Sequence, residues 1–124
     1  MILNCAIIDD EPLAADLLAS YAKKIPELNL IGTFNSAVSA MKILRENPVQ
    51  LLFLDIQMPE LSGLEFASIL PKETRIVFTT AFDRYAVEGY KVNAIDYLLK
   101  PISYDRFVVA VNKTLDWFTM FNKQ

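Results

Sequence analysis

The sequence predicts an α/β domain built on a doubly wound, five-stranded parallel sheet. Five short runs of residues are almost wholly apolar, which is typical of strands that helices cover on both faces. Between these runs, apolar residues recur with the spacing of amphipathic helices. Strand and helix therefore alternate, as in sheets assembled from right-handed βαβ crossovers. In such a sheet the functional crevice lies at the carboxyl ends of the strands.

The expected strands are too apolar on both sides to belong to a half-exposed antiparallel sheet. They run from Ile2 to Ile8, Leu28 to Phe34, Gln50 to Leu54, Arg75 to Thr80 and Ala94 to Leu99. No internal repeat, low-complexity tract or Gly/Ser-rich linker divides the chain. We therefore expect residues 1–124 to form one domain.

Five helices are expected beside these strands. Ser36 is a suitable N-cap for the second helix, which ends before Asn47 because a proline follows. The first helix has a proline in its first turn, and the third stops at a proline. The other four run from Pro12 to Ile25, Leu64 to Leu70, Tyr85 to Lys91 and Tyr104 to Phe121.

The composition excludes several classes of function. The chain has 124 residues, with 12 basic and 15 acidic side chains and a formal net charge of −3, which argues against direct binding of DNA, RNA or an anionic membrane. It contains no histidine, which excludes Ser-His-Asp and Cys-His hydrolases and the commonest zinc ligand. The chain therefore cannot carry a phosphohistidine of its own.

Cysteine usage and hydropathy indicate a reducing compartment. The single cysteine, Cys5, lies in an apolar run and is expected to be a core residue. No stretch has the ~20 uninterrupted apolar residues of a membrane helix, and the N-terminus lacks a signal-peptide pattern. We expect a soluble, cytoplasmic protein.

Polar residues follow four of the expected strands. The first strand leads into Asp9-Asp10-Glu11, the third into Asp55, the fourth ends at Thr80, and the fifth leads into Lys100. Carboxylates held together repel by roughly 4 kcal/mol per pair at 4 Å and an effective dielectric of 20, so the cluster needs a proton or a cation. Oxygen ligands without His or Cys favour Mg²⁺, and a lysine and a threonine are suitable donors to a phosphoryl group.

Each of these residues also has a plain structural interpretation. Asp9 and Asp10 could cap the first helix, Thr80 could be an ordinary strand residue and Lys100 a surface charge. Asp55 is harder to explain in this way because it terminates the most apolar strand of the chain. Their convergence on one sheet edge favours a site that holds a phosphoryl group beside a metal.

Four segments resemble the receiver domain of two-component response regulators over essentially the whole chain. They are Ile7-Ile8-Asp9-Asp10-Glu11, Phe53-Leu54-Asp55-Ile56-Gln57-Met58-Pro59, Thr80-Ala81 and Tyr97-Leu98-Leu99-Lys100-Pro101. The resemblance implies a flavodoxin-like sheet of order 2-1-3-4-5 with five helices. It also implies phosphoaspartate chemistry.

The resemblance assigns a role to each residue of this set. Asp55 would accept a phosphoryl group from a phosphohistidine on a partner sensor kinase. Asp10 would bind Mg²⁺ directly, Asp9 through water or by orienting ligands, Gln57 through its backbone carbonyl, and Asp55 would complete the metal site. Lys100 would pair with the phosphoryl oxygens. The chain would then assist its own modification by in-line positioning and charge neutralisation, as a switch and not an enzyme.

The resemblance extends to the readout. Thr80 would move to hydrogen-bond the phosphoryl group, and the aromatic Tyr97 would then swing inward and change the face formed by the fourth helix, fifth strand and fifth helix. The alternative for Tyr97 is a half-buried strand tyrosine. The Lys100-Pro101 bond would be cis, an isomer that prolyl bonds adopt more readily than others. Phe82, two places after Thr80, would hinder water and prolong the phosphoaspartate to minutes or longer.

The segments 82–87 and 92–97 resemble receivers attached to LytTR-type DNA-binding domains. DNA contact would then require a C-terminal effector domain that this chain lacks. In the last helix, Tyr104, Phe107, Val108, Val111, Leu115 and Phe118 form a core stripe, and Trp117 and Met120 point almost the opposite way. These outward residues predict a partner surface, and we expect phosphorylation to promote a homodimer.

Three alternatives use related folds or chemistry. A phosphatase of the haloacid-dehalogenase type needs an Asp-x-Asp pair, whereas Asp9 and Asp10 are adjacent. An FMN carrier needs a Ser/Thr/Gly-rich phosphate loop where this chain has Asp10-Glu11-Pro12. A receiver-like module without phosphorylation is the binding-only alternative, although every expected site residue is present.

Overall fold

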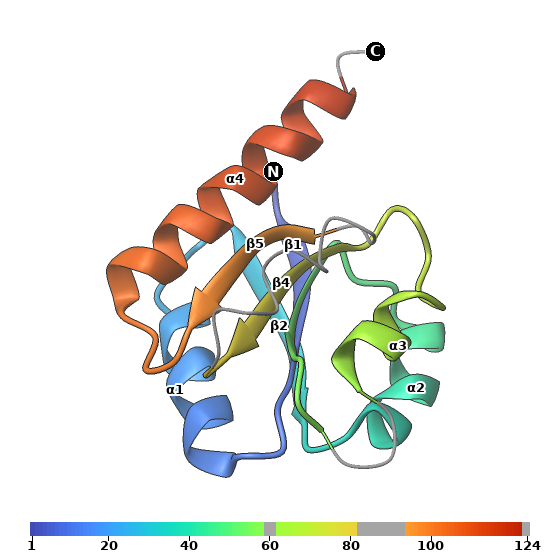
Figure 1. Cartoon of the computed structure of the whole chain (residues 1–124). Helices are drawn as coiled ribbons and strands as arrows, with labels where there is room; N and C mark the ends of the chain where they lie inside the picture. The colour runs from blue at the N-terminus through green and yellow to red at the C-terminus, as the bar shows by residue number, and fades with distance from the viewer. Residues whose placement is uncertain (59–61, 82–93, 123–124) are drawn as a thin grey trace.

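The computed structural model describes residues 1–58, 62–81 and 94–122, and its centre is the expected five-stranded sheet (Figure 1). The strand order is β2-β1-β3-β4-β5 and every neighbouring pair is parallel, which confirms the order that the sequence resemblance implies. The strands are β1 (Leu3–Ile8), β2 (Leu28–Phe34), β3 (Leu51–Asp55), β4 (Arg75–Thr80) and β5 (Ala94–Leu99).

Burial explains which strands read as continuous apolar runs. Every residue of β3 is buried, and one residue of β1 and one of β4 are partly exposed. These three strands form the middle of the sheet and have helices over both faces. The edge strands β2 and β5 are mostly half-exposed.

Four helices lie within the described residues: α1 (Pro12–Ala22), α2 (Ala37–Glu46), α3 (Gly63–Ala67) and α4 (Tyr104–Asn122). α1 and α4 cover one face of the sheet, and α2 and α3 cover the other (Figure 1). The helix expected from Tyr85 to Lys91 lies outside the described residues. Ser36 caps α2 as expected, because its side chain accepts a hydrogen bond from the backbone N–H of Ser39.

Two helices are shorter than their apolar periodicity predicts. α1 ends at Ala22, after which the N–H of Ile25 donates to the carbonyl of Ala22 in a 3₁₀-type turn. α3 ends at Ala67, and the N–H of Leu70 donates to the carbonyl of Ala67 in the same manner. The apolar pattern continues through such turns, so it does not show where the α-helix ends.

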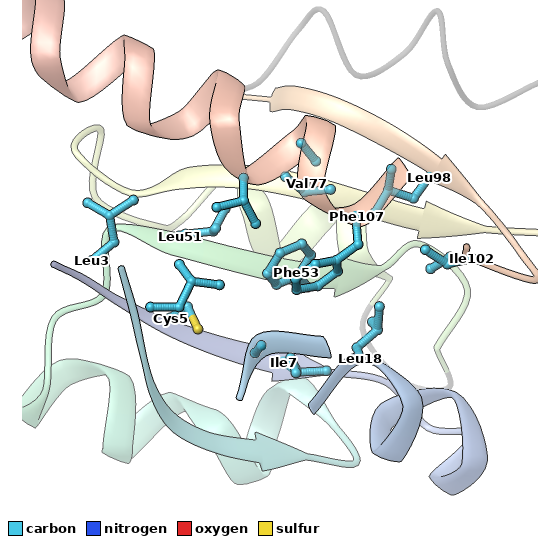
Figure 2. Packing of buried hydrophobic residues seen from close by; sticks show 14 of the residues in the cluster. Leu3, Cys5, Ile7, Leu18, Leu51, Phe53, Val77, Leu98, Ile102 and Phe107 are labelled. Atoms are coloured by element: carbon cyan, nitrogen blue, oxygen red, sulfur yellow. The ribbon is translucent and has the colours of Figure 1, made fainter. Parts of the chain in front are cut away.

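Two apolar cores lie on the two faces of the sheet. The core under α1 and α4 is drawn in Figure 2, where the rings of Phe53 on β3 and Phe107 on α4 stack with centroids 4.7 Å apart. Cys5 belongs to this core and is fully buried, which confirms its structural role. Burial raises the pKa of its thiol to about 12. The second core packs α2 and α3 against the alternate residues of the same strands.

The C-terminal half of α4 departs from the sequence-based expectation. The helix extends beyond the end of the sheet (Figure 1), and Met120 is exposed, as expected. Trp117 was expected to point outward, but it is half-buried because the guanidinium of Arg75, at the start of β4, lies 4.2 Å above its ring. The ring of Phe118 also packs edge-on against it. None of the described helices is long and apolar enough to cross a membrane.

Candidate functional site

The sheet places the expected site residues at its carboxyl edge. Asp9 follows β1, Asp55 ends β3, Thr80 ends β4 and Lys100 follows β5. Backbone hydrogen bonds extend beyond the strands: the N–H of Asp9 donates to Phe34 at 2.9 Å, and the N–H of Lys100 donates to Thr80 at 2.7 Å. The backbone that carries these side chains is therefore fixed by the hydrogen bonds of the sheet.

Four carboxylates meet at this edge. Asp9, Asp10, Glu11 and Asp55 each offer one oxygen, and these oxygens lie within 4.8 Å of one another. Asp9 and Asp55 are buried, and Asp10 and Glu11 are exposed. The predicted convergence of Asp9, Asp10 and Asp55 is confirmed, and Glu11 joins a cluster to which the sequence reasoning gave it no role.

Lys100 is the cation of this cluster. Its Nζ lies 2.8 Å from Glu11 Oε1, 3.0 Å from Asp9 Oδ2 and 3.5 Å from Asp55 Oδ2. Burial lowers the pKa of Lys100, but its hydrogen bond to Glu11 and its close contact with Asp9, together with the nearby negative charges, outweigh burial and raise the pKa above its ordinary value. Lys100 is therefore held as an ammonium.

The surroundings of Asp55 make ionisation of its carboxyl group unfavourable. Burial, and next the negative charge of Asp9, raise the pKa of Asp55 to about 7 despite the opposing effect of Lys100. A hydrogen bond with Asp10 raises the pKa further, whereas the backbone N–H of Gln57, which donates to Asp55 Oδ1 at 3.2 Å, lowers it. One lysine does not neutralise the cluster, so a further cation would favour the reactive carboxylate.

The donor set fits a hard divalent cation. Asp9 Oδ2 is buried and accepts no hydrogen bond of regular geometry, although Lys100 Nζ lies 3.0 Å away. Its other oxygen accepts the backbone N–H of Glu11 at 2.9 Å. Carboxylate oxygens in a group without nitrogen or sulfur ligands suit Mg²⁺. Asp9, Asp10, Asp55 and the neighbouring Gln57 are the residues that could hold it.

The expected switch residues lie on β4 and β5. Thr80 is buried next to the site, and in the β4–β5 ladder it pairs with Leu99, the residue before Lys100. Tyr97 is half-buried and its ring stacks on Phe78, with centroids 5.4 Å apart. Tyr97 thus has the burial that a plain strand tyrosine would also have. The Lys100–Pro101 bond is cis, as expected.

Phe82, expected to control access of water, lies outside the described residues.

Gly63 is a structural residue of the site that the sequence reasoning missed. Its N–H donates to the carbonyl of Ile56 at 2.9 Å, which joins the start of α3 to the residue after Asp55. A Cβ at this position would lie 2.3 Å from the carbonyl oxygen of Asp55 and 2.9 Å from the Cα of Ile56. The sequence gives little indication of this role, because Gly63 is one of three glycines in the chain and follows a serine that caps a helix.

Comparison with known proteins agrees with this geometry. A family model for the response regulator receiver domain matches residues 5–112. An uncharacterized response regulatory protein of Shewanella oneidensis is 42% identical over 115 residues, which cover 91% of this chain and 47% of that protein. The transcriptional regulatory protein BtsR of Escherichia coli K12 is 42% identical over 102 residues, which cover 81% of this chain and 43% of BtsR. The chain spans about half the length of these relatives.

A solved structure is also similar. The response regulatory domain of protein mrkE from Klebsiella pneumoniae has 31% sequence identity and a TM-score of 0.80, over 98% of this chain and 99% of that domain. The receiver domain of a Luxo repressor protein from Vibrio parahaemolyticus, at 22% identity and a TM-score of 0.85, shares the fold.

Proposed function

Because the chain belongs to the response regulator receiver domain family, we propose that it is a phosphorylation-dependent switch in which Asp55 accepts a phosphoryl group from a sensor histidine kinase. One observation carries the assignment of Asp55. Its buried carboxylate ends the central strand β3, close to the ammonium of Lys100 and to the carboxylates of Asp9 and Asp10. A nucleophile for phosphoryl transfer needs this combination of fixed position and nearby positive charge.

The proposed transfer is an in-line displacement. A carboxylate oxygen of Asp55 forms a bond to phosphorus as the phosphorus–nitrogen bond of the phosphohistidine breaks, and the imidazole leaves with the electron pair and takes up a proton. Lys100, 3.5 Å from Asp55 Oδ2, moves onto the oxygens of the transferred group, and Thr80 donates its hydroxyl to another of them. When bound by Asp9, Asp10, Asp55 and the Gln57 carbonyl, Mg²⁺ supplies charge that offsets the phosphoryl oxygens.

The chain acts on itself and not on a separate substrate. The transfer and the later hydrolysis both occur at Asp55, so the chain is a self-modifying switch and not a turnover enzyme. Phe82 would slow the hydrolysis. The rearrangement of Thr80 and Tyr97 would carry the signal to β5 and α4.

An exposed apolar surface beside the site supports docking of the kinase on α1. Leu13 is 85% exposed and Leu17 is 38% exposed, on the helix that follows Asp10. With Ala81, Lys100 and Ile102, among other residues, they line a groove of about 380 Å³ that reaches the site. A partner helix seated there would bring its phosphohistidine to Asp55.

We propose that the output lies in a longer regulator of which this domain is a part. BtsR, about twice as long as the matched region, is named a transcriptional regulatory protein. We therefore propose a cytoplasmic response regulator that controls transcription through a C-terminal effector domain of the LytTR type, the only part that contacts DNA. Phosphorylation would promote a homodimer through the face that includes β5 and the exposed Met120 side of α4.

Intact-mass spectrometry after incubation with acetyl phosphate and Mg²⁺ tests the proposal. The wild-type chain should gain about 80 Da, the mass of one phosphoryl group, and should lose the gain when EDTA replaces Mg²⁺. Asp55→Asn should gain nothing. Asp116→Asn, which removes an exposed carboxylate on α4, should react as the wild type does. No adduct on the wild-type chain would support the module without phosphorylation instead.

A further inference from the structure

Glu11 is the nearest partner of the lysine that the phosphoryl group needs. Lys100 Nζ donates to Glu11 Oε1 at 2.8 Å, whereas Asp55 Oδ2 is 3.5 Å away. The ammonium therefore contacts both carboxylates, and its shorter contact is with the one that is not the acceptor. This contact joins the residue before α1 to the residue after β5.

The side chain of Glu11 has no other structural task among the described contacts. It occupies the N-cap position of α1, where a side chain commonly accepts a backbone N–H, yet it makes no such hydrogen bond. Its backbone is already fixed, because its N–H donates to Asp9 Oδ1 at 2.9 Å. Its side chain is 65% exposed, so it can leave Lys100 without leaving a buried charge unpaired.

We propose that Glu11 is a positioning residue that keeps the ammonium of Lys100 in an ion pair of its own until a phosphoryl group arrives. The inference rests on the proposed phosphoryl transfer to Asp55. The incoming phosphodonor is anionic and enters a site with four carboxylates and one ammonium. Glu11 both adds to that negative charge and competes with the donor for Lys100. Its ion pair with Lys100 therefore slows phosphorylation and is exchanged for an ion pair with the phosphoryl oxygens.

The rate of phosphorylation by acetyl phosphate tests the role. With Mg²⁺ at saturation, Glu11→Gln should raise the second-order rate constant by about two- to fivefold, the effect of breaking one exposed ion pair. Glu11→Asp keeps the charge but shortens the side chain by one methylene, so it should approach the rate of Glu11→Gln. Asp116→Asn removes an exposed carboxylate elsewhere and should leave the rate unchanged.

Three outcomes would overturn the proposal. An unchanged or lower rate in Glu11→Gln shows that the ion pair does not restrain Lys100. A wild-type rate in Glu11→Asp means that the effect of Glu11→Gln comes from the charge alone and not from the contact with Lys100. A loss of Mg²⁺ affinity of about tenfold in Glu11→Gln, measured by calorimetry, makes Glu11 a metal ligand. Failure of the proposed function is distinct, since the wild-type chain would then gain no phosphoryl group at all.

Discussion

Replacing Gly63 with alanine puts a methyl group where the backbone of β3 already lies. The new Cβ would be 2.3 Å from the carbonyl oxygen of Asp55 and 2.9 Å from the Cα of Ile56. Both are backbone atoms, so no side-chain rotation relieves the contact and the start of α3 must move away. That shift also breaks or lengthens the 2.9 Å hydrogen bond from Gly63 N–H to Ile56.

The magnitude follows from these contacts. Overpacking of this kind costs about 1–3 kcal/mol, and a lost backbone hydrogen bond costs about 1 kcal/mol. The smaller unfolded-state entropy of alanine returns roughly 0.5 kcal/mol, because the glycine has no positive φ that alanine would strain against. We expect a net loss of about 1.5–3.5 kcal/mol in the free energy of unfolding, or roughly 6–13 °C in Tm for a domain of this size.

Gly32→Ala is the matched control for this substitution. A Cβ at Gly32, on the edge strand β2, would meet the side chain of Phe34 at 3.3 Å, and that ring can turn. Urea and thermal unfolding should show a change below about 1 kcal/mol in the control and the large loss in Gly63→Ala. The phosphorylation rate of Gly63→Ala should also fall, because the added methyl group presses on the backbone that positions the Asp55 side chain. Equal Tm values for the two variants would refute the argument.

Three further predictions concern the site and the assembly. The pKa of Asp55 is raised to about 7, so the folded form binds its proton more tightly than the unfolded chain, and this stability is lost as pH rises through 7. Metal-free wild type should lose about 2–3 kcal/mol more than Asp55→Asn between about pH 5 and 8 in urea unfolding, and equal pH slopes would contradict the assignment. Tyr21→Phe removes the 2.8 Å hydrogen bond to the Ile102 carbonyl and should cost about 0.5–1.5 kcal/mol in the same assay; no change would mean that water satisfies that carbonyl. Sedimentation of the longest natural form of the protein should give a larger mass with beryllofluoride and Mg²⁺ than without, and the same mass in both would contradict the homodimer.

The sequence predicts the sheet and most of the site because both depend on short apolar runs and on the residues that directly follow them. Burial of β3 on both faces leaves a continuous apolar run, and Asp55 at its end is conspicuous for that reason. Asp9, Thr80 and Lys100 follow because parallel strands end at one edge. Their meeting at a single site therefore requires no knowledge of loop geometry.

Contacts between residues that are far apart in the sequence are not predictable in this way. The preference of Lys100 for Glu11 over Asp55 depends on how far two flexible side chains extend. The need for glycine at position 63 arises from the close approach of α3 to β3. Helical periodicity alone predicts that Trp117 is exposed. It cannot show that Arg75, 42 positions earlier in the chain, lies above the ring.

The chemical location of the phosphoryl group tests the central claim most directly. Borohydride reduces an acyl phosphate to an alcohol and leaves free carboxylates unchanged, so it marks the acceptor permanently. After reaction with acetyl phosphate and Mg²⁺, peptide mass spectrometry should find homoserine in place of aspartate at position 55 and unmodified aspartate at positions 9 and 10. Homoserine at position 9 or 10, or at no position in a chain that has gained a phosphoryl group, would contradict the account.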